Sequence, residues 1–458
     1  MNLRKRRVVV RNIARPFDRF FTKISGGGML LMLATVIALI WANSPLQDLY
    51  EILWKGHLSI VFEPFKKLEP IDFGLSLLHW VNDGLMVLFF FVIGLEIKRE
   101  VLAGELKSFR QAIFPIFAAL GGVVIPMGIY FSFGLEGEAA KGWGIPMATD
   151  IAFSLAILSM IGPRVPLSLK VFLTALAIAD DLAAILVIAL FYGGTVAWPY
   201  LFAAFILLAI LAIANYYDVQ QVSLYAVLGI IIWYLFLQSG VHATIAGVLI
   251  AMTVPARTRI QAHHFIPKVK WRLRKFSNIP TEGQSFLLDD DQLNAINDIE
   301  TIMQEVQSPL QKMEHRLSGV VNYFILPLFA LSNAGVVLIA SGSSLASITE
   351  VFTSLSLIIA ASLIFGKVIG ISLFSWLAVK LKLAGKPENV SWLSYIGLGF
   401  LGGIGFTMSI FIATLAFDSP ALQDQAKIGI FVGSIISGVA GYLLLKYSLR
   451  TKTQKKKS

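Results

Sequence analysis

Two aspartates, Asp180 and Asp181, stand side by side in a stretch that is otherwise largely apolar from Val171 to Tyr192. A carboxylate at the centre of a membrane helix costs at least ~2.5–3.5 kcal/mol by insertion scales, and a like-charged neighbour adds repulsion. A chain that keeps both is expected to use them, with a cation and protons as ligands. Adjacent helical residues point ~100° apart, so one carboxylate can face a water-filled cavity while the other faces a neighbouring helix. Alternatively, each carboxylate is only a hydrogen-bonded anchor between helices.

Two further charged residues lie within apolar segments. Asp150 follows a Gly-rich start at 142–147, where it either caps a helix N-terminus or helps to build an ion site. Lys367 lies in LIFGKVIGISLF, too central to extend its amine easily to either membrane face. A buried ammonium needs a carboxylate partner, and Asp150, Asp180 and Asp181 are the candidates.

Other polar residues lie nearer the ends of apolar segments. Glu96, Arg99 and Glu100 close one segment, where a solvated charge cluster is the default interpretation. His242 begins another segment, where a hydrogen-bonded interface residue is the default. For Asp83, a packing role and a functional role are equally compatible with the sequence.

The composition is that of an all-α polytopic membrane protein. Of the 458 residues, 56% are hydrophobic and 14% charged, with a mean hydropathy of +0.74. A span needs about 20 apolar residues, or fewer where a helix is broken. Twelve transmembrane helices are predicted, at 27–44, 76–96, 112–133, 145–161, 166–192, 198–217, 222–239, 241–254, 319–341, 352–380, 393–417 and 427–447.

Lysine and arginine predict the orientation, because they stay on the cytoplasmic side. Basic residues crowd both termini, at 4–23 and 450–457, so both termini are predicted to be cytoplasmic, which requires an even number of spans. The net charge of +10 follows from this distribution, with anionic lipid of the bilayer as the nearer partner. No nucleic-acid-binding motif is present.

The chain is predicted to form one transporter domain over residues 1–458. An external hairpin loop is expected at 45–75 and a cytoplasmic loop at 255–318, the latter with an amphipathic helical part at 291–315. The absence of cysteine excludes disulfides and thiolate metal sites, and no cofactor is implied.

Two predicted spans share an interruption. The fourth begins GWGIPMATDIAFSLAIL and the eleventh GLGFLGGIGFTMSIFIATLAF, each a Gly-rich stretch followed by a threonine, Thr149 or Thr407. Paired interrupted helices in the two halves of a transporter indicate a midplane binding site, built from helix-end dipoles and free carbonyls. Close helix packing is the alternative role of the glycines.

These segments, with NDGLMVLFFFVIGLEIKRE, SGVHATIAG, ILPLFALSNAGV and FGKVIGISLF, resemble the NhaA family of bacterial sodium–proton antiporters over about residues 25–445. The resemblance implies a multi-pass protein of the bacterial inner membrane. It also implies inverted-topology repeats, spans 3–5 and 10–12, in which interrupted spans 4 and 11 cross at midplane. The external hairpin suggests a homodimer.

The resemblance also implies residue roles. Asp181 corresponds to the more exposed ligand of the transported Na⁺, and Asp180 to the partner of Lys367. Thr149 and Asp150 correspond to the polar pair at the helix crossing. Glu96, Arg99 and Glu100 correspond to cytoplasmic residues implicated in pH regulation, and His242 is a further candidate for that role. Two features depart from the family: Val368 stands where a proline is frequent, and the 255–318 loop is longer and more acidic.

The expected activity is export of Na⁺, and of Li⁺, in exchange for protons by alternating access, serving pH and sodium homeostasis. Burial and a like-charged neighbour both favour protonated carboxyls, whereas a bound Na⁺ favours ionised ones, so cation and protons compete. The chain is a secondary active transporter and not an enzyme in this interpretation. Sodium-coupled symport of an organic solute is the alternative, because it can share the broken-helix architecture.

Overall fold

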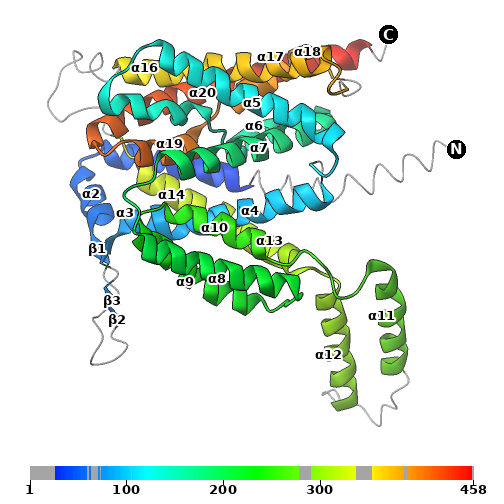
Figure 1. Ribbon diagram of the computed structural model, residues 1–458. Coiled ribbons are helices and arrows are strands. Elements are labelled where there is room, and N and C mark those ends of the chain that lie inside the picture. Colours follow the sequence, from blue (N-terminus) through cyan, green and yellow to red (C-terminus); the bar gives the residue numbers. More distant parts are fainter. Residues whose placement is uncertain are drawn as a thin grey trace.

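The computed structural model describes residues 26–58, 61–62, 71–72, 74–104, 106–277, 290–336, 353–385 and 390–455. Most helices run side by side in one elongated bundle, and the short strands lie at one end of it (Figure 1). The basic N-terminal cluster of residues 4–23, together with Lys456 and Lys457, falls outside the described residues.

In the first half of the chain, helix Gly26–Ala42 precedes the labelled elements. These are α2 (Gln47–Lys55), β1 (His57–Leu58), β2 (Val61–Phe62), β3 (Ile71–Asp72), β4 (Leu75–Ser76), α3 (Leu77–His79), η1 (Trp80–Leu85), α4 (Met86–Ala103), α5 (Phe109–Ser132), η2 (Gly137–Met147), α6 (Ile151–Met160), η3 (Gly162–Arg164), α7 (Leu167–Phe191) and α8 (Trp198–Tyr216).

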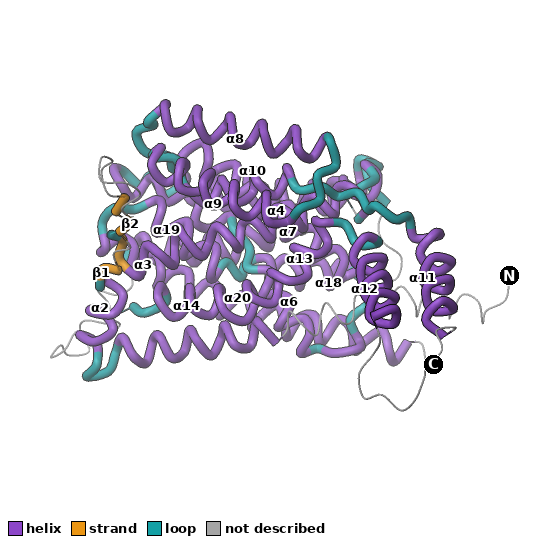
Figure 2. Tube along the Cα trace, turned by 90° about the horizontal axis from the view of Figure 1, so that it is seen from below, coloured by secondary structure: helices purple, strands orange, loops and turns teal. Residues whose placement is uncertain are grey.

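The second half is also helical in the described residues. Its elements are α9 (Val222–Ser239), α10 (Ala243–Thr253), α11 (Ala262–Ser277), α12 (Asp290–Glu305), α13 (Pro309–Val320), η4 (Val321–Ile325), α14 (Leu326–Asn333), α16 (Ser354–Ala361), η5 (Ser362–Gly366), α17 (Lys367–Lys380), α18 (Trp392–Gly402), α19 (Phe406–Ala416) and α20 (Pro420–Lys455). Figure 2 shows the same helix-dominated trace from below.

Six described helices are long and apolar enough to cross a membrane by length and composition, or up to nine spans if three bent helix pairs are each counted as one. The polytopic helical class is therefore as predicted. Two of the bent pairs, η2 with α6 and α18 with α19, are the predicted interrupted spans, with bends of 42° and 43°. Over an 18-residue apolar stretch of each helix, only 17% of the residues of α8 and 22% of those of α9 are buried, so both helices expose apolar faces suited to lipid.

Two antiparallel strand pairs, over 57–76, overlap the segment expected to form a hairpin at 45–75. His57 and Leu58 of β1 pair with Ser76 and Leu75 of β4, and β2 pairs with β3 further along. The residues between β2 and β3, at 63–70, lie outside the described residues.

The segment at 255–318 contains α11, α12 and most of α13. Helices α11 and α12 lie side by side across the direction of the bundle and project from it (Figure 1). Arg272 Nη1 and Asp298 Oδ2 join them at 2.5 Å. At the base, the backbone amides of Arg259 and Ile260 donate to the Glu305 carbonyl at 3.1 and 3.2 Å, so the insert begins and ends at one point.

Candidate functional site

The two helix interruptions meet. The first lies between η2 and α6 at residues 148–150, and the second lies between α18 and α19 at 403–405. The Asp150 amide donates to the Ile404 carbonyl at 2.6 Å, which joins the two breaks directly. Pro146 and the glycines at 402, 403 and 405 disfavour continuous helix at these points. Each break leaves helix-end groups that need partners.

One carboxylate serves the N-termini of both broken helices. Asp150 Oδ1 accepts from the Phe153 amide at 3.0 Å, as the N-cap of α6. Its Oδ2 accepts from the Thr407 amide at 3.0 Å and from the Thr407 hydroxyl at 2.5 Å, at the start of α19. Because a helix N-terminus carries partial positive charge, the buried carboxylate is compensated by two helix ends at once.

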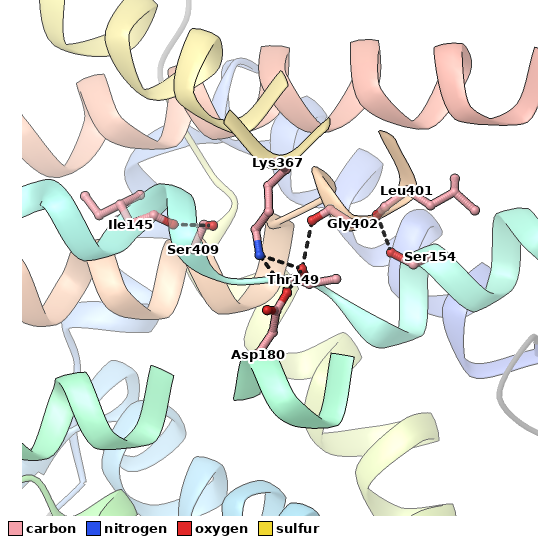
Figure 3. A network of polar contacts seen from close by, with 8 residues as sticks. All are labelled: Ile145, Thr149, Ser154, Asp180, Lys367, Leu401, Gly402 and Ser409. Atoms are coloured by element: carbon pink, nitrogen blue, oxygen red, sulfur yellow. Dashed lines mark hydrogen bonds and ion pairs between the residues drawn. The ribbon is translucent and has the colours of Figure 1, made fainter. Parts of the chain in front are cut away.

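Hydroxyl groups satisfy the opposite, carbonyl-bearing ends of the broken helices (Figure 3). Ser154 Oγ donates to the Leu401 carbonyl at 2.7 Å, and Ser409 Oγ donates to the Ile145 carbonyl at 2.7 Å. We did not identify either serine from the sequence. The sequence feature that could have indicated them is a hydroxyl side chain among apolar neighbours: Ser154 lies four residues after Asp150, and Ser409 lies two residues after Thr407.

Lys367 reaches the site from α17 and pairs with Asp180 on α7. Its Nζ lies 2.6 Å from Asp180 Oδ2 and donates to Thr149 Oγ1 at 3.0 Å (Figure 3). The Thr149 hydroxyl in turn has two acceptors within reach, Asp180 Oδ2 at 2.6 Å and the Gly402 carbonyl at 2.8 Å. All three side chains are fully buried. A hydroxyl has one proton, so Thr149 can donate to only one of the two oxygens at a time.

Asp181 lies in a different environment from its neighbour. It is 2% exposed. Among the described residues the Oδ1 atoms of both aspartates have no hydrogen-bond partner, but only Asp180 has its Oδ2 bonded to Lys367. It borders a cavity whose lining does not include Asp180. The lining residues are Phe89, Val92, Ile93, Glu96, Thr149, Asp150, Ile151, Ala152, Thr174, Asp181, Ser318, Val321, Asn322, Leu326, Thr407 and Met408.

The cavity is electrostatically suited to a cation. Three of its lining residues, Glu96, Asp150 and Asp181, are carboxylic acids, and none of the described lining residues is a lysine or arginine. Thr149 and Thr407, at the helix breaks, also contribute hydroxyl oxygens to the lining. A cleft lined by one sign of charge concentrates ions of the opposite sign. Hard cations such as Na⁺ prefer oxygen ligands of this kind.

Arg99 organises the charged cluster at the end of α4. Its guanidinium donates to Glu100 at 2.9 Å and pairs with Glu314 of α13, a residue we did not identify from the sequence. Glu314 precedes the predicted span at 319–341. Burial raises the pKa of the Glu314 carboxyl above its ordinary value, although Arg99 acts to lower it. Glu96, Arg99 and Glu100 therefore share a cluster, with Glu96 facing the cavity.

His242 lies apart from that cluster. Its Nε2 donates to the Tyr192 carbonyl at the end of α7, and the residue immediately precedes α10. At the other end of α10, Lys98 Nζ donates to the Met252 and Val254 carbonyls at 2.6 and 2.5 Å. At 1.5 Å per residue, the eleven residues of α10 separate His242 from the α4 cluster by roughly 16 Å.

These features define a class: a polytopic helical membrane protein with paired carboxylates at the meeting point of two broken helices. The family described as Na⁺/H⁺ antiporter 1 matches residues 18–445. The chain belongs to this family, which confirms the resemblance found in the sequence.

Several curated relatives cover nearly the whole chain. The Na⁺/H⁺ antiporter NhaA of Oleidesulfovibrio alaskensis is 46% identical over 96% of both chains. The Na⁺/H⁺ antiporter NhaA of Phocaeicola vulgatus is 45% identical over 96% of this chain and 97% of its own. The Na⁺/H⁺ antiporter NhaA 2 of Syntrophotalea carbinolica is 44% identical over 94% and 96%.

Proposed function

We propose that this Na⁺/H⁺ antiporter exports Na⁺ in exchange for protons by alternating access, and that Asp180 and Asp181 are the carboxylates for which both ions compete. The observation that carries the proposal is the division between the two side chains. Asp180 is paired through Oδ2 with Lys367 and does not line the cavity, whereas Asp181 lines the carboxylate-bearing cavity.

In this mechanism Asp181 is the principal ligand of the transported Na⁺ and Asp180 the second. Na⁺ binds only to ionised carboxylates, whereas protons bind to the same oxygens and neutralise them. Binding of Na⁺ is therefore coupled to release of protons. Lys367 compensates the charge of Asp180 when no Na⁺ is bound. Thr149 and Asp150 shape the site by holding the two helix breaks together.

Exchange requires only that Na⁺ and protons cannot occupy the site together and that the site opens to each side in turn. If more than one proton enters for each Na⁺ that leaves, each cycle moves net charge. The membrane potential then contributes ~2.3 kcal/mol per charge per 100 mV.

The proposed architecture is twelve spans with inverted repeats at spans 3–5 and 10–12, crossing at midplane through spans 4 and 11. The joined breaks and their similar bends of 42° and 43° support this arrangement. We further propose a multi-pass protein of the bacterial inner membrane, with both termini in the cytoplasm.

Further assignments rest on the family resemblance and the geometry together. We assign Glu96, Arg99, Glu100 and His242 to pH regulation, Li⁺ to the substrates, and pH and sodium homeostasis to the physiological role. By the family resemblance, we also propose a homodimer that forms through the segment that carries the strand pairs, at 57–76. The alternative of sodium-coupled symport has no support from the family or the relatives, which are named as Na⁺/H⁺ antiporters.

The test is transport by purified protein in liposomes with an acidic lumen. Addition of Na⁺ or Li⁺ outside should alkalinise the lumen, as reported by an entrapped pH-sensitive dye, whereas an organic solute should change neither the rate nor the extent. Absence of a Na⁺-dependent pH change between pH 6.5 and 9, with folded protein present, would contradict antiport.

A further inference from the structure

Helices α5 and α17 cross with their backbones in contact. A Cβ atom on Gly121 of α5 would lie 2.3 Å from the Gly370 carbonyl oxygen, and one on Gly370 of α17 would lie 2.1 Å from the Gly121 carbonyl oxygen. At the end of η5, directly before α17, a Cβ on Gly366 would lie 2.6 Å from the Pro126 Cα. Side chains at these positions would force the helices apart, so the crossing depends on glycine on both sides.

The same crossing brings Gly122 of α5 against the Lys367 amine. A Cβ on Gly122 would lie 3.5 Å from Lys367 Nζ and 3.2 Å from Ile371 Cγ1. Ile371 is one helical turn beyond Lys367 on the same face of α17, and both are fully buried. The amine is therefore enclosed between the α5 backbone at Gly122 and the oxygens of Asp180 and Thr149.

We propose that Gly122 is a positioning residue for Lys367: the missing side chain lets α17 approach α5 closely enough for the amine to contact Asp180 and Thr149. The inference rests on the proposed function, because it assigns Gly122 a role in the competition between Lys367 and Na⁺ for the aspartates. The observation behind it does not depend on that function, since it consists of the distances from the Gly122 Cβ position to Ile371 and to the Lys367 amine.

A methyl group at position 122 acts on the ion pair through two contacts. At 3.2 Å from Ile371, it requires that side chain and the adjoining turn of α17 to give by a few tenths of an ångström. At 3.5 Å from Nζ, it is in ordinary van der Waals contact with the ammonium. Because Lys367 lies one turn from Ile371, a shift of that turn moves the amine and weakens its hold on Asp180. When the Lys367 ammonium interacts less strongly with Asp180, it repels Na⁺ less and competes with it less, so the carboxylates bind Na⁺ more tightly.

The chain provides a matched control on the same helix. A Cβ on Gly128 would meet no atom within 4 Å, so Gly128→Ala makes the same chemical change to α5 without touching α17. Both substitutions change helix propensity alike. A difference between Gly122→Ala and Gly128→Ala therefore reports the contact with Lys367 and Ile371.

The experiment measures the Na⁺ dissociation constant by calorimetry on the purified full-length protein, in the wild type, both glycine variants, Lys367→Ala and the double variant Gly122→Ala/Lys367→Ala. Gly122→Ala should lower the constant about three-fold or more, and Gly128→Ala should leave it unchanged. The Gly122→Ala change should disappear in the Lys367→Ala background. Mere destabilisation would lower the folded fraction without tightening Na⁺ binding.

Three results would overturn the inference: an unchanged constant in Gly122→Ala, a raised constant, or the same change with and without Lys367. Wild-type protein that binds no Na⁺ would instead refute the proposed function and this inference with it. Wild-type protein that binds Na⁺ beside an unaffected Gly122→Ala variant would refute the inference alone.

Discussion

The two adjacent aspartates have different surroundings because neighbouring positions on α7 face different neighbours. Asp180 faces Lys367 of α17 and Thr149 at the first helix break, and Asp181 faces the cavity. The sequence was sufficient to predict that the two side chains diverge, since helical geometry separates them by ~100°. It was not sufficient to decide which one meets the lysine; only the family resemblance indicated that pairing.

We predict that Asp181→Asn abolishes Na⁺ binding without unfolding the protein. Asparagine keeps the size and hydrogen bonding of the side chain but removes the charge that attracts Na⁺ into the cavity. Calorimetry should detect no Na⁺ binding, and Na⁺-driven proton release should fall to background, while the melting temperature is retained. Wild-type Na⁺ affinity in this variant would exclude Asp181 as the ligand.

We also predict strong coupling between Asp180 and Lys367. Removing either partner leaves an uncompensated buried charge, a change that costs ~3–5 kcal/mol in buried pairs, whereas removing both leaves none. Asp180→Asn and Lys367→Ala should each lower the free energy of unfolding in mixed micelles. The double variant should lose at least ~1 kcal/mol less than the sum of the single losses. Additive losses would show that the pair does not form in the folded protein.

At the level of elements, the glycine-rich stretches predicted where the helices break but not what holds the broken ends. Asp150 was recognised as a possible cap of its own helix, because an aspartate before an apolar run has that signature. Its second role at Thr407 depends on two segments 257 residues apart meeting in space. The serines that bond the Leu401 and Ile145 carbonyls depend on the same meeting, so sequence patterns could not identify them.

The link between α4 and α13 yields a prediction on pH. Burial raises the pKa of Glu314 above its ordinary 4.5, with Arg99 opposing the shift. A carboxyl whose folded pKa is raised contributes stability that is fully present below the unfolded pKa and is lost as pH rises through the folded pKa. Glu314→Gln cannot ionise, so its melting temperature should fall less than that of the wild type as pH rises from about 4.5.

The measurement is a series of melting curves at fixed ionic strength across this pH range. At low pH Glu314 is protonated and uncharged, like glutamine, so the two proteins should have similar melting temperatures there, and the wild type should fall below the Gln variant as pH rises. A control, Glu51→Gln, removes a carboxyl on α2 whose pKa is lowered by Lys55, and should give the opposite change in slope. Parallel curves for wild type and Glu314→Gln would contradict the assignment.

For the molecule as a whole, hydropathy was sufficient to predict a polytopic helical protein, because every stretch of about 20 apolar residues must satisfy its backbone internally. Each predicted apolar stretch contains helix in its described residues, and two of them are interrupted, at 148–150 and 403–405. The 255–318 segment was harder to predict, since α11 and α12 have mixed polar faces and pack chiefly on each other. The strand pairs at 57–76 are two residues long, too short for a pattern of alternating polarity.

The orientation of the chain in the membrane gives the last prediction. The chain contains no cysteine, so a single introduced cysteine reports its own location without further substitutions. Thr195, between α7 and α8, and Lys270, on α11, are both exposed and are predicted to lie outside and inside the cell respectively. A membrane-impermeant maleimide should label Thr195→Cys in intact cells and Lys270→Cys only after permeabilisation. Labelling of Lys270→Cys in intact cells would place the α11–α12 insert outside and reverse the proposed orientation. If neither cysteine were labelled until the cells were permeabilised, the 193–197 connection would not lie outside as predicted.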